Sequence, residues 1–203
     1  MRAPRDTAQP AGSADGGAAP RRADKAGPGG LSLRDAVAGD ATAIAAIWNP
    51  IIRDTVVTFW PTPRRASEIA TLIARRQAAG WAFLVAETTE TASGLAGFGS
   101  VFQFRGGPGY ARTMEHTVYV APAVQGRGIG AALLRALEAR AAAAGARALI
   151  GAVTGSNAAS LAFHRRHGYA PVGRIPEAGW KFGRFHDLVL MHKRIGVVPA
   201  EPS

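Results

Sequence analysis

Residues 118–130 read VYVAPAVQGRGIG, a β-branched run that meets a proline turn and then a glycine-rich loop with one arginine. This loop opens an alanine- and leucine-rich segment that is expected to be a helix. Glycine lets backbone N–H groups face outward, and a helix N-terminus adds free N–H groups and a positive dipole end. Such a loop binds phosphate or pyrophosphate without side-chain ligands. The stretch therefore predicts a phosphorylated cofactor.

Two common nucleotide motifs fit this loop poorly. A Walker loop carries Lys-Ser/Thr after its last glycine, whereas Ala131-Ala132 stands here. The spacing Gly126-x-Gly128-x-x-Ala131 matches the dinucleotide fingerprint, but that fold needs the loop after its first strand and an acid closing the next strand. This loop comes late in the chain, and the following expected strand ends without an acid. Neither ATP nor a nicotinamide cofactor is favoured.

Length and composition predict one α/β domain. The chain has 203 residues, of which 47% are hydrophobic, enough for one sizeable core and cramped for two domains. Residues 1–30 hold no apolar residue larger than Met1, so we expect a disordered tail or a start codon placed too early. The domain is expected at 31–196, with a C-terminal tail at 197–203.

Cysteine and long apolar runs are missing from the sequence. The absence of cysteine excludes disulfides and thiolate chemistry and fits a reducing cytoplasm, which is the expected location. No 18-residue apolar run exists, so no membrane span is expected. The net charge of +10 can indicate nucleic-acid binding, a site for anionic ligands, or the arginine bias of a GC-rich genome. Because the cations are scattered, we favour codon bias and expect no nucleic-acid partner.

Hydrophobic periodicity and chain breakers predict the element order β-α-α-β-β-β-α-β-α-β-β. The first helix is expected to be capped by Asp40 and ended or bent at Asn49-Pro50. A mixed sheet with helices on both faces follows from this order. Strands are expected at 31–37, 81–87, 94–104, 113–120, 148–153, 169–175 and 185–192, and further helices at 67–80, 128–144 and 157–167.

Four motifs in this order resemble those of the GNAT N-acetyltransferases. The loop QGRGIG at 125–130 is similar to their Q/R-x-x-G-x-G/A pyrophosphate loop. EHTVYV at 115–120 leads into it, NAASLAFHRRHGY at 157–169 follows it, and GWKFGRFHD at 179–187 closes the pattern. Together they resemble the phosphinothricin and methionine-sulfoximine acetyltransferase branch. The resemblance implies a GNAT fold of the α/β (α+β) class, with a mostly antiparallel sheet, a splayed strand pair and a homodimer.

The same resemblance implies that acetyl-CoA lies between the two splayed strands. The strand before the loop would pair with the pantetheine arm through its backbone, and the loop N–H groups would hold the pyrophosphate. Arg127 either adds charge or is solvated, and Asn157 either bonds the pantetheine or caps a helix. The implied cofactor residues are Val118, Tyr119, Val120, Gln125, Gly126, Arg127, Gly128, Ile129, Gly130 and Asn157.

Glu115 and His164 are the candidate catalytic residues. Acetyl transfer needs a base, because an ammonium has no lone pair, and Glu115 is a lone acid in an apolar strand. Its alternative role is a salt bridge with Arg112 or Arg105. The resembled branch has histidine at the position of His164, and its imidazole could supply or relay a proton, or serve in packing.

The acceptor pocket is predicted less directly. The resembled branch holds its amino acid with an aromatic residue and an arginine before the glutamate. Tyr110 matches the aromatic, Ala111 replaces the arginine, and Arg105 and Arg112 are the nearby cations. Phe59, Trp60 and Lys181-Phe182 could line the pocket, a dimer seam or the core. His116, His186 and His192 lack metal-ligand spacing, so they are interpreted as structural or solvated, and no metal is expected.

The leading hypothesis is an acetyl-CoA-dependent N-acetyltransferase for the primary amine of a small amino-acid-like substrate. Its rivals are a protein N-terminal acetyltransferase, a basic nucleic-acid-binding protein and a degenerate acetyl-CoA-binding regulator. The sequence lacks an RNA-binding aromatic motif, a zinc finger or a convincing recognition helix. Glu115 and His164 argue against lost chemistry.

Overall fold

The computed structural model describes residues 31–196, and the two expected tails at 1–30 and 197–203 lie outside the described residues. Its elements follow the predicted order. The strands are β1 (Ser32–Asp35), β2 (Phe83–Glu87), β3 (Leu95–Gln103), β4 (Thr113–Val120), β5 (Ala148–Thr154), β6 (Ala170–Lys181) and β7 (Arg184–Arg194). The helices are α1 (Ala41–Asp54), α2 (Ala66–Ala78), α3 (Ile129–Ala143) and α4 (Ala158–Arg166), with 3-10 turns η1 (Ala38–Asp40), η2 (Pro108–Tyr110) and η3 (Pro122–Val124).

One sheet runs through the described residues in the order β1-β2-β3-β4-β5-β7-β6. All of its pairings are antiparallel except that between β4 and β5. This parallel pair is short: it begins at Thr113 opposite Ala148 and ends at His116 opposite Gly151. Both strands continue beyond that point without pairing to each other. The pair is therefore splayed, as predicted.

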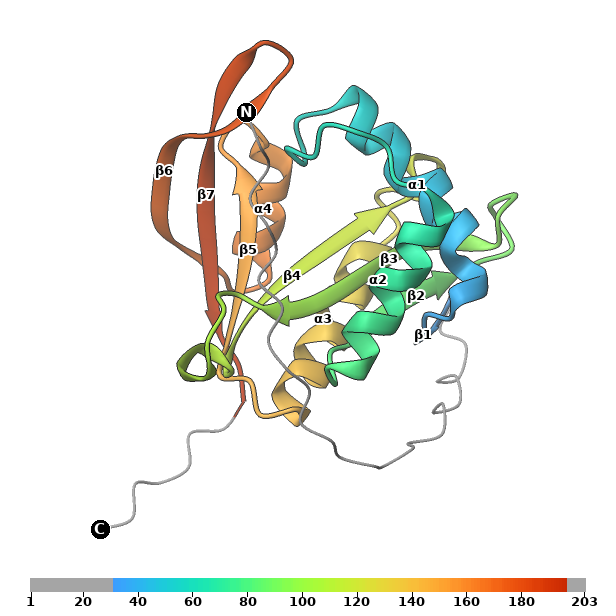
Figure 1. Ribbon diagram of the computed structural model, residues 1–203, viewed down its shortest axis with the longest axis horizontal. Helices are drawn as coiled ribbons and strands as arrows, with labels where there is room; N and C mark the ends of the chain where they lie inside the picture. Colours follow the sequence, from blue (N-terminus) through green and yellow to red (C-terminus); the bar gives the residue numbers. More distant parts are fainter. Residues whose placement is uncertain (1–30, 197–203) are drawn as a thin grey trace.

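The helices cover both faces of the sheet. Figure 1 shows α1 and α2 in front of the strands and α3 behind them. Helix α3 buries Leu133 and Leu137 completely against β3, where two glycines allow the close approach. A Cβ on Gly99 would lie 2.8 Å from Leu137 Cδ1, and one on Gly97 would lie 2.5 Å from the carbonyl oxygen of Tyr119. The sequence of β3 thus fixes both its helix packing and its pairing with β4.

The beginning and middle of α1 differ from expectation. Asp40 occupies the N-cap position, but its side chain makes no capping bond to α1. Its carboxylate instead accepts hydrogen bonds from the Arg34 guanidinium, at 2.7 and 2.8 Å, and from the Val37 N–H. Of the two effects expected at Pro50, a bend or an end of the helix, the end is contradicted, because α1 continues to Asp54. The fully buried Ile52 lies beyond the proline, so the packing of this turn outweighs the lost backbone bond.

Candidate functional site

The splayed strands open into a cleft of about 820 Å³. Its walls come from the ends of β4 and β5, the glycine loop, α4 and the C-terminal part of α1. All of the predicted cofactor residues except Arg127 line it, namely Val118, Tyr119, Val120, Gln125, Gly126, Gly128, Ile129, Gly130 and Asn157. The structure therefore gathers these segments around one space.

Two glycines shape the loop that precedes α3. Gly126 and Gly128 have φ angles of 80° and 79°, in the left-handed region that costs other residues about 1–2 kcal/mol. Gly128 is the N-cap of α3, and the N–H of Ala132 donates to its carbonyl as the helix begins. The N–H groups that precede Ala132 at the start of α3 thus have no acceptor within the helix. They form a cradle for an anion at the mouth of the cleft.

Arg127 lies in the same loop but does not line the cleft. Its guanidinium forms an ion pair with Glu90, which lies in the turn between β2 and β3. Both side chains are about half exposed, so this pair contributes little stability. The backbone of the loop, and not its arginine, faces the space between the strands.

Asn157 caps α4. Its Oδ1 accepts a hydrogen bond of 3.0 Å from the N–H of Ser160. This is the structural alternative expected for the residue, and it fixes the orientation of the amide. No described residue accepts a hydrogen bond from its Nδ2, and the side chain lines the cleft. The same amide can therefore cap the helix through oxygen and donate to a ligand through nitrogen.

Glu115 lies at the apex of the strand split, one residue before the β4–β5 pairing ends. Neighbouring residues alternate between faces, and His116 contacts α4, so Glu115 points to the α1/α2 face. Burial raises the pKa of its carboxyl to about 7, and attraction to Arg76 partly opposes this rise. Within residues 31–196 it forms no salt bridge, with Arg105, Arg112 or any other residue.

His164 approaches the split from the opposite face. Its Nδ1 lies 2.7 Å from the carbonyl oxygen of Ser160, and because a carbonyl only accepts, Nδ1 carries the proton. Nε2 is buried with no hydrogen-bond partner among the described residues. A Cβ on Gly151 would lie 2.6 Å from this Nε2, so β5 needs glycine there. Burial lowers the pKa of His164, which keeps the ring neutral and its Nε2 lone pair available.

His116 is a cleft residue that the sequence interpretation treated as structural or solvated. Its ring stacks on His164 with centroids 5.2 Å apart, and it is only 5% exposed. Burial lowers its pKa to about 3, with further repulsion from His164. The alternation of β4 held a usable signal, since His116 lies on the same face as Val118 and Val120. It forms the floor beneath His164.

Two arginines on the α1/α2 face were not predicted. Arg64 lies over the rings of Trp48 and Trp60, at 4.8 and 4.1 Å from their centroids. Arg76 lies 3.8 Å from the centroid of Phe102, the residue paired with Glu115 across β3 and β4. Both segments are remote from β4 in sequence, so no local motif could reveal their proximity.

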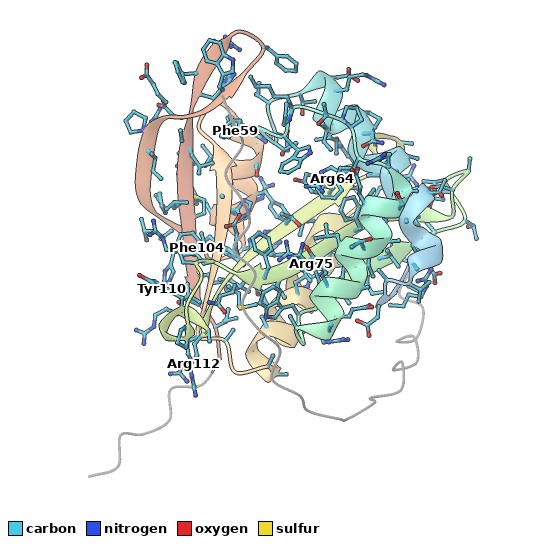
Figure 2. All side chains as sticks on the ribbon, in the orientation of Figure 1. Phe59, Arg64, Arg75, Phe104, Tyr110 and Arg112 are labelled. Carbon is cyan, nitrogen blue, oxygen red and sulfur yellow. The ribbon has the colours of Figure 1, made fainter. Side chains whose placement is uncertain are left out.

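The predicted acceptor residues lie in the loop between β3 and β4. Arg105, Tyr110 and Arg112 are exposed, and none lines the cleft. Figure 2 shows Tyr110 and Arg112 at the outer end of this loop, away from Arg64. The loop is closed by Gln103, whose Nε2 donates to the carbonyl of Gly107 at 2.7 Å. An acceptor role for these three residues stays a prediction.

Residues 31–196 contain neither a metal-binding cluster nor a membrane-spanning helix. There, no group of three or more His, Cys, Asp or Glu side chains could hold a metal ion. Within the same range, no helix has the length and apolar character needed to cross a membrane.

Comparisons with known proteins identify similar chains. The model of the acetyltransferase (GNAT) family matches residues 48–169. An L-methionine sulfoximine/L-methionine sulfone acetyltransferase of Pseudomonas paraeruginosa is 34% identical over 171 residues, covering 84% of this chain and 98% of the relative. An L-amino acid N-acyltransferase of Escherichia coli is 33% identical over 165 residues, covering 81% and 94%. A phosphinothricin acetyltransferase structure from Sinorhizobium meliloti, in complex with AcCoA, has a TM-score of 0.77 at 31% identity, covering 84% and 94%.

Proposed function

Since this chain belongs to the acetyltransferase (GNAT) family, we propose that it transfers the acetyl group of acetyl-CoA to the primary amine of a small amino-acid-like substrate. The family match and the similar structures confirm the predicted fold and enzyme class. Relatives named for methionine sulfoximine and L-amino acids support the class of acceptor. The observation that carries the proposal is that Glu115 lies where the β4–β5 pairing ends, next to a cleft that His164 and the glycine loop line.

The residues around the cleft fit the donor. Beyond His116, the β4 edge that faces β5 has no strand partner, so a pantetheine arm can pair with it as an added strand does. The N–H groups around Gly126 and Gly128 suit the pyrophosphate, and Asn157 Nδ2 suits a carbonyl of the arm. Acetyl-CoA, when bound, supplies the acetyl group as an activated thioester.

Glu115 is proposed to accept the proton of the incoming ammonium, directly or through water. A base must be deprotonated when it acts, and its strength rises with its pKa. A carboxyl with a pKa of about 7 is half ionised near neutrality, whereas an ordinary glutamate is a far weaker base. Burial therefore tunes Glu115 to the task that an amine acceptor sets.

His164 is proposed to relay a proton at the thiol side of the cleft. Because its ring is neutral and Nδ1 is bonded to Ser160, Nε2 is an acceptor before it can be a donor. It can take the proton that the attacking nitrogen loses as the amide forms and pass it to the thiolate that departs as the C–S bond breaks. This arrangement supports a relay over an acid that is protonated from the start.

The test is a thiol-release assay with acetyl-CoA and a panel of amino acids, amines and peptides, with mass spectrometry of the products. The proposal expects N-acetylation of at least one small amino acid, and slow or no acetylation of peptides. Acetylation of peptide N-termini alone would contradict the acceptor class. Absence of both acetyl transfer and acetyl-CoA binding would contradict the function altogether.

We also propose that two copies associate through the β6–β7 hairpin. Strand β6 lies at the edge of the sheet, and this hairpin exposes a group of large apolar side chains. They are Val172, Ile175, Trp180, Phe182 and Phe185, each 47–59% exposed. The rings of Trp180 and Phe185 lie 4.7 Å apart between centroids, and exposed apolar groups of this kind indicate an interface. Light scattering should report a dimer, and Trp180→Ser should weaken it. Val37→Ser is the control, because Val37 is 53% exposed but lies outside the hairpin, and it should leave the dimer intact. A monomeric wild type would contradict the proposal.

A further inference from the structure

Arg64 and Arg76 are partly buried cations that differ in their partners from Arg34 and Lys193. Arg34 and Lys193 are paired with carboxylates at 2.7 Å, whereas Arg64 and Arg76 form no salt bridge with a described residue. Each has a fully buried Nε without a hydrogen-bond partner among residues 31–196. Burial lowers the pKa of both, that of Arg76 to about 10. Two desolvated guanidinium groups are thus held without a counterion.

Arg64 is held in a fixed orientation. Asn49 of α1 clamps its backbone, accepting from its N–H at 2.8 Å and donating to its carbonyl at 3.0 Å. Its guanidinium stacks between Trp48 and Trp60, which leaves the N–H groups at the edge of the plane for a ligand. Figure 2 shows Arg64 in the middle of the view, near the C-terminal half of β4. A preorganised cation of this kind loses little entropy on binding an anion.

Arg76 connects this position to the candidate base. It lies over Phe102, the β3 partner of Glu115, and is attracted to Glu115 from beyond salt-bridge distance. Arg76 and Arg64 also repel each other, so they lie within electrostatic range. Glu68, the acid that attracts Arg64, is engaged by the N–H and guanidinium of Arg65. The face beside Glu115 therefore carries two cations that only an added anion would fully neutralise.

We propose that Arg64 and Arg76 bind an acidic group of the acceptor, and so restrict acetylation to amines that carry a carboxylate or similar anion close to the amine. This inference rests on the proposed function and names the substrate class of the same site. The planar N–H groups of arginine suit a carboxylate, which can accept two parallel hydrogen bonds. An acceptor anchored there presents its ammonium toward Glu115, on the same face of β4.

The test compares matched ligands by calorimetry on the full protein loaded with CoA. The pairs are methionine sulfone, leucine and glutamate, each against its α-carboxamide, at a pH where both amines are protonated. Charge-assisted hydrogen bonds predict that the carboxylate binds about ten- to a hundredfold more tightly in at least one pair. Arg64→Gln should bring that ratio close to one, and Arg64→Lys should restore part of it.

Arg75→Gln is the matched control, because Arg75 is the exposed neighbour of Arg76 on α2 and should leave the ratio unchanged. A wild-type ratio near one in every pair overturns the inference, as does an equal loss in Arg75→Gln and Arg64→Gln. Acetyl transfer is assayed in parallel. Transfer without charge discrimination contradicts the anion site alone, and discrimination without transfer to any amine contradicts the proposed function alone.

Discussion

On the α3/α4 face of β4, the site is built from backbone and glycine, whereas on the α1/α2 face it is built from charged side chains. The first face presents loop N–H groups, an unpaired strand edge and the neutral His164. The second presents Glu115 with Arg76 and Arg64. A site built from backbone groups suits acetyl-CoA, because the same phosphates and amides must be bound in every turnover. A side-chain site can be changed residue by residue, so it suits the choice of acceptor.

The largest expected effect is a loss of turnover on substituting Glu115, without a change in acetyl-CoA affinity. Glu115→Gln keeps the shape of the side chain and removes the proton acceptor. We expect the turnover number to fall about 10²- to 10⁴-fold, the usual contribution of a positioned base. Acetyl-CoA affinity, measured by calorimetry, should stay as in the wild type because Glu115 is not among the residues that line the cleft. A parallel loss of affinity and turnover would mean that the two faces do not act separately.

A smaller effect is expected at Gly151, where the donor face meets His164. The Cβ of Gly151→Ala would stand 2.6 Å from Nε2, so the ring must turn away and lose its 2.7 Å contact with Ser160. We expect turnover to fall about a hundredfold, at the low end of the usual contribution of positioned proton transfer. Gly173→Ala is the control, since no atom lies within 4 Å of its added Cβ. Equal turnover in the two variants would remove His164 from the reaction.

The smallest of these effects tests the loop backbone. Gly128→Ala forces a side chain onto a residue with φ of 79°, which costs about 1–2 kcal/mol and should weaken acetyl-CoA binding about tenfold. Gly130→Ala is the control, because its added Cβ would make only an ordinary 3.5 Å contact with Val120. It should change affinity by about twofold or less. Equal losses at both positions would argue against a conformational role for Gly128.

The donor face was largely predictable because its signals are local. The loop glycines, the helix that follows them and the capping residue Asn157 each act within a few residues of one another. The order of helices and strands along the chain also followed from periodicity. The path of α1 through Pro50 was not predictable, because the packing of Ile52 that stabilises it involves residues distant in sequence.

Of the three charged residues Glu115, Arg64 and Arg76 on the α1/α2 face, the sequence indicated only Glu115 as a site residue. Arg64 and Arg76 come from the α1–α2 connection and from α2, and only the packing of these segments brings Arg76 within electrostatic range of both Glu115 and Arg64. The sequence favoured Arg105, Tyr110 and Arg112 because they are near Glu115 along the chain. In the fold they lie in the exposed loop between β3 and β4. Nearness to Glu115 along the chain therefore does not place them on the same face of β4.

The central claim is that burial on the α1/α2 face makes Glu115 the base and that Arg76 tunes it. The pH dependence of kcat/KM tests this most directly, because it reports the ionisations of the free enzyme. A base acts when deprotonated, so activity should rise with pH through about 7 in the wild type. Arg76 lowers the pKa of Glu115, so Arg76→Leu should move this rise to higher pH, whereas Arg75→Leu should move it much less. A rise at the same pH in Arg76→Leu and the wild type, or one centred near the ordinary glutamate pKa, would contradict the account.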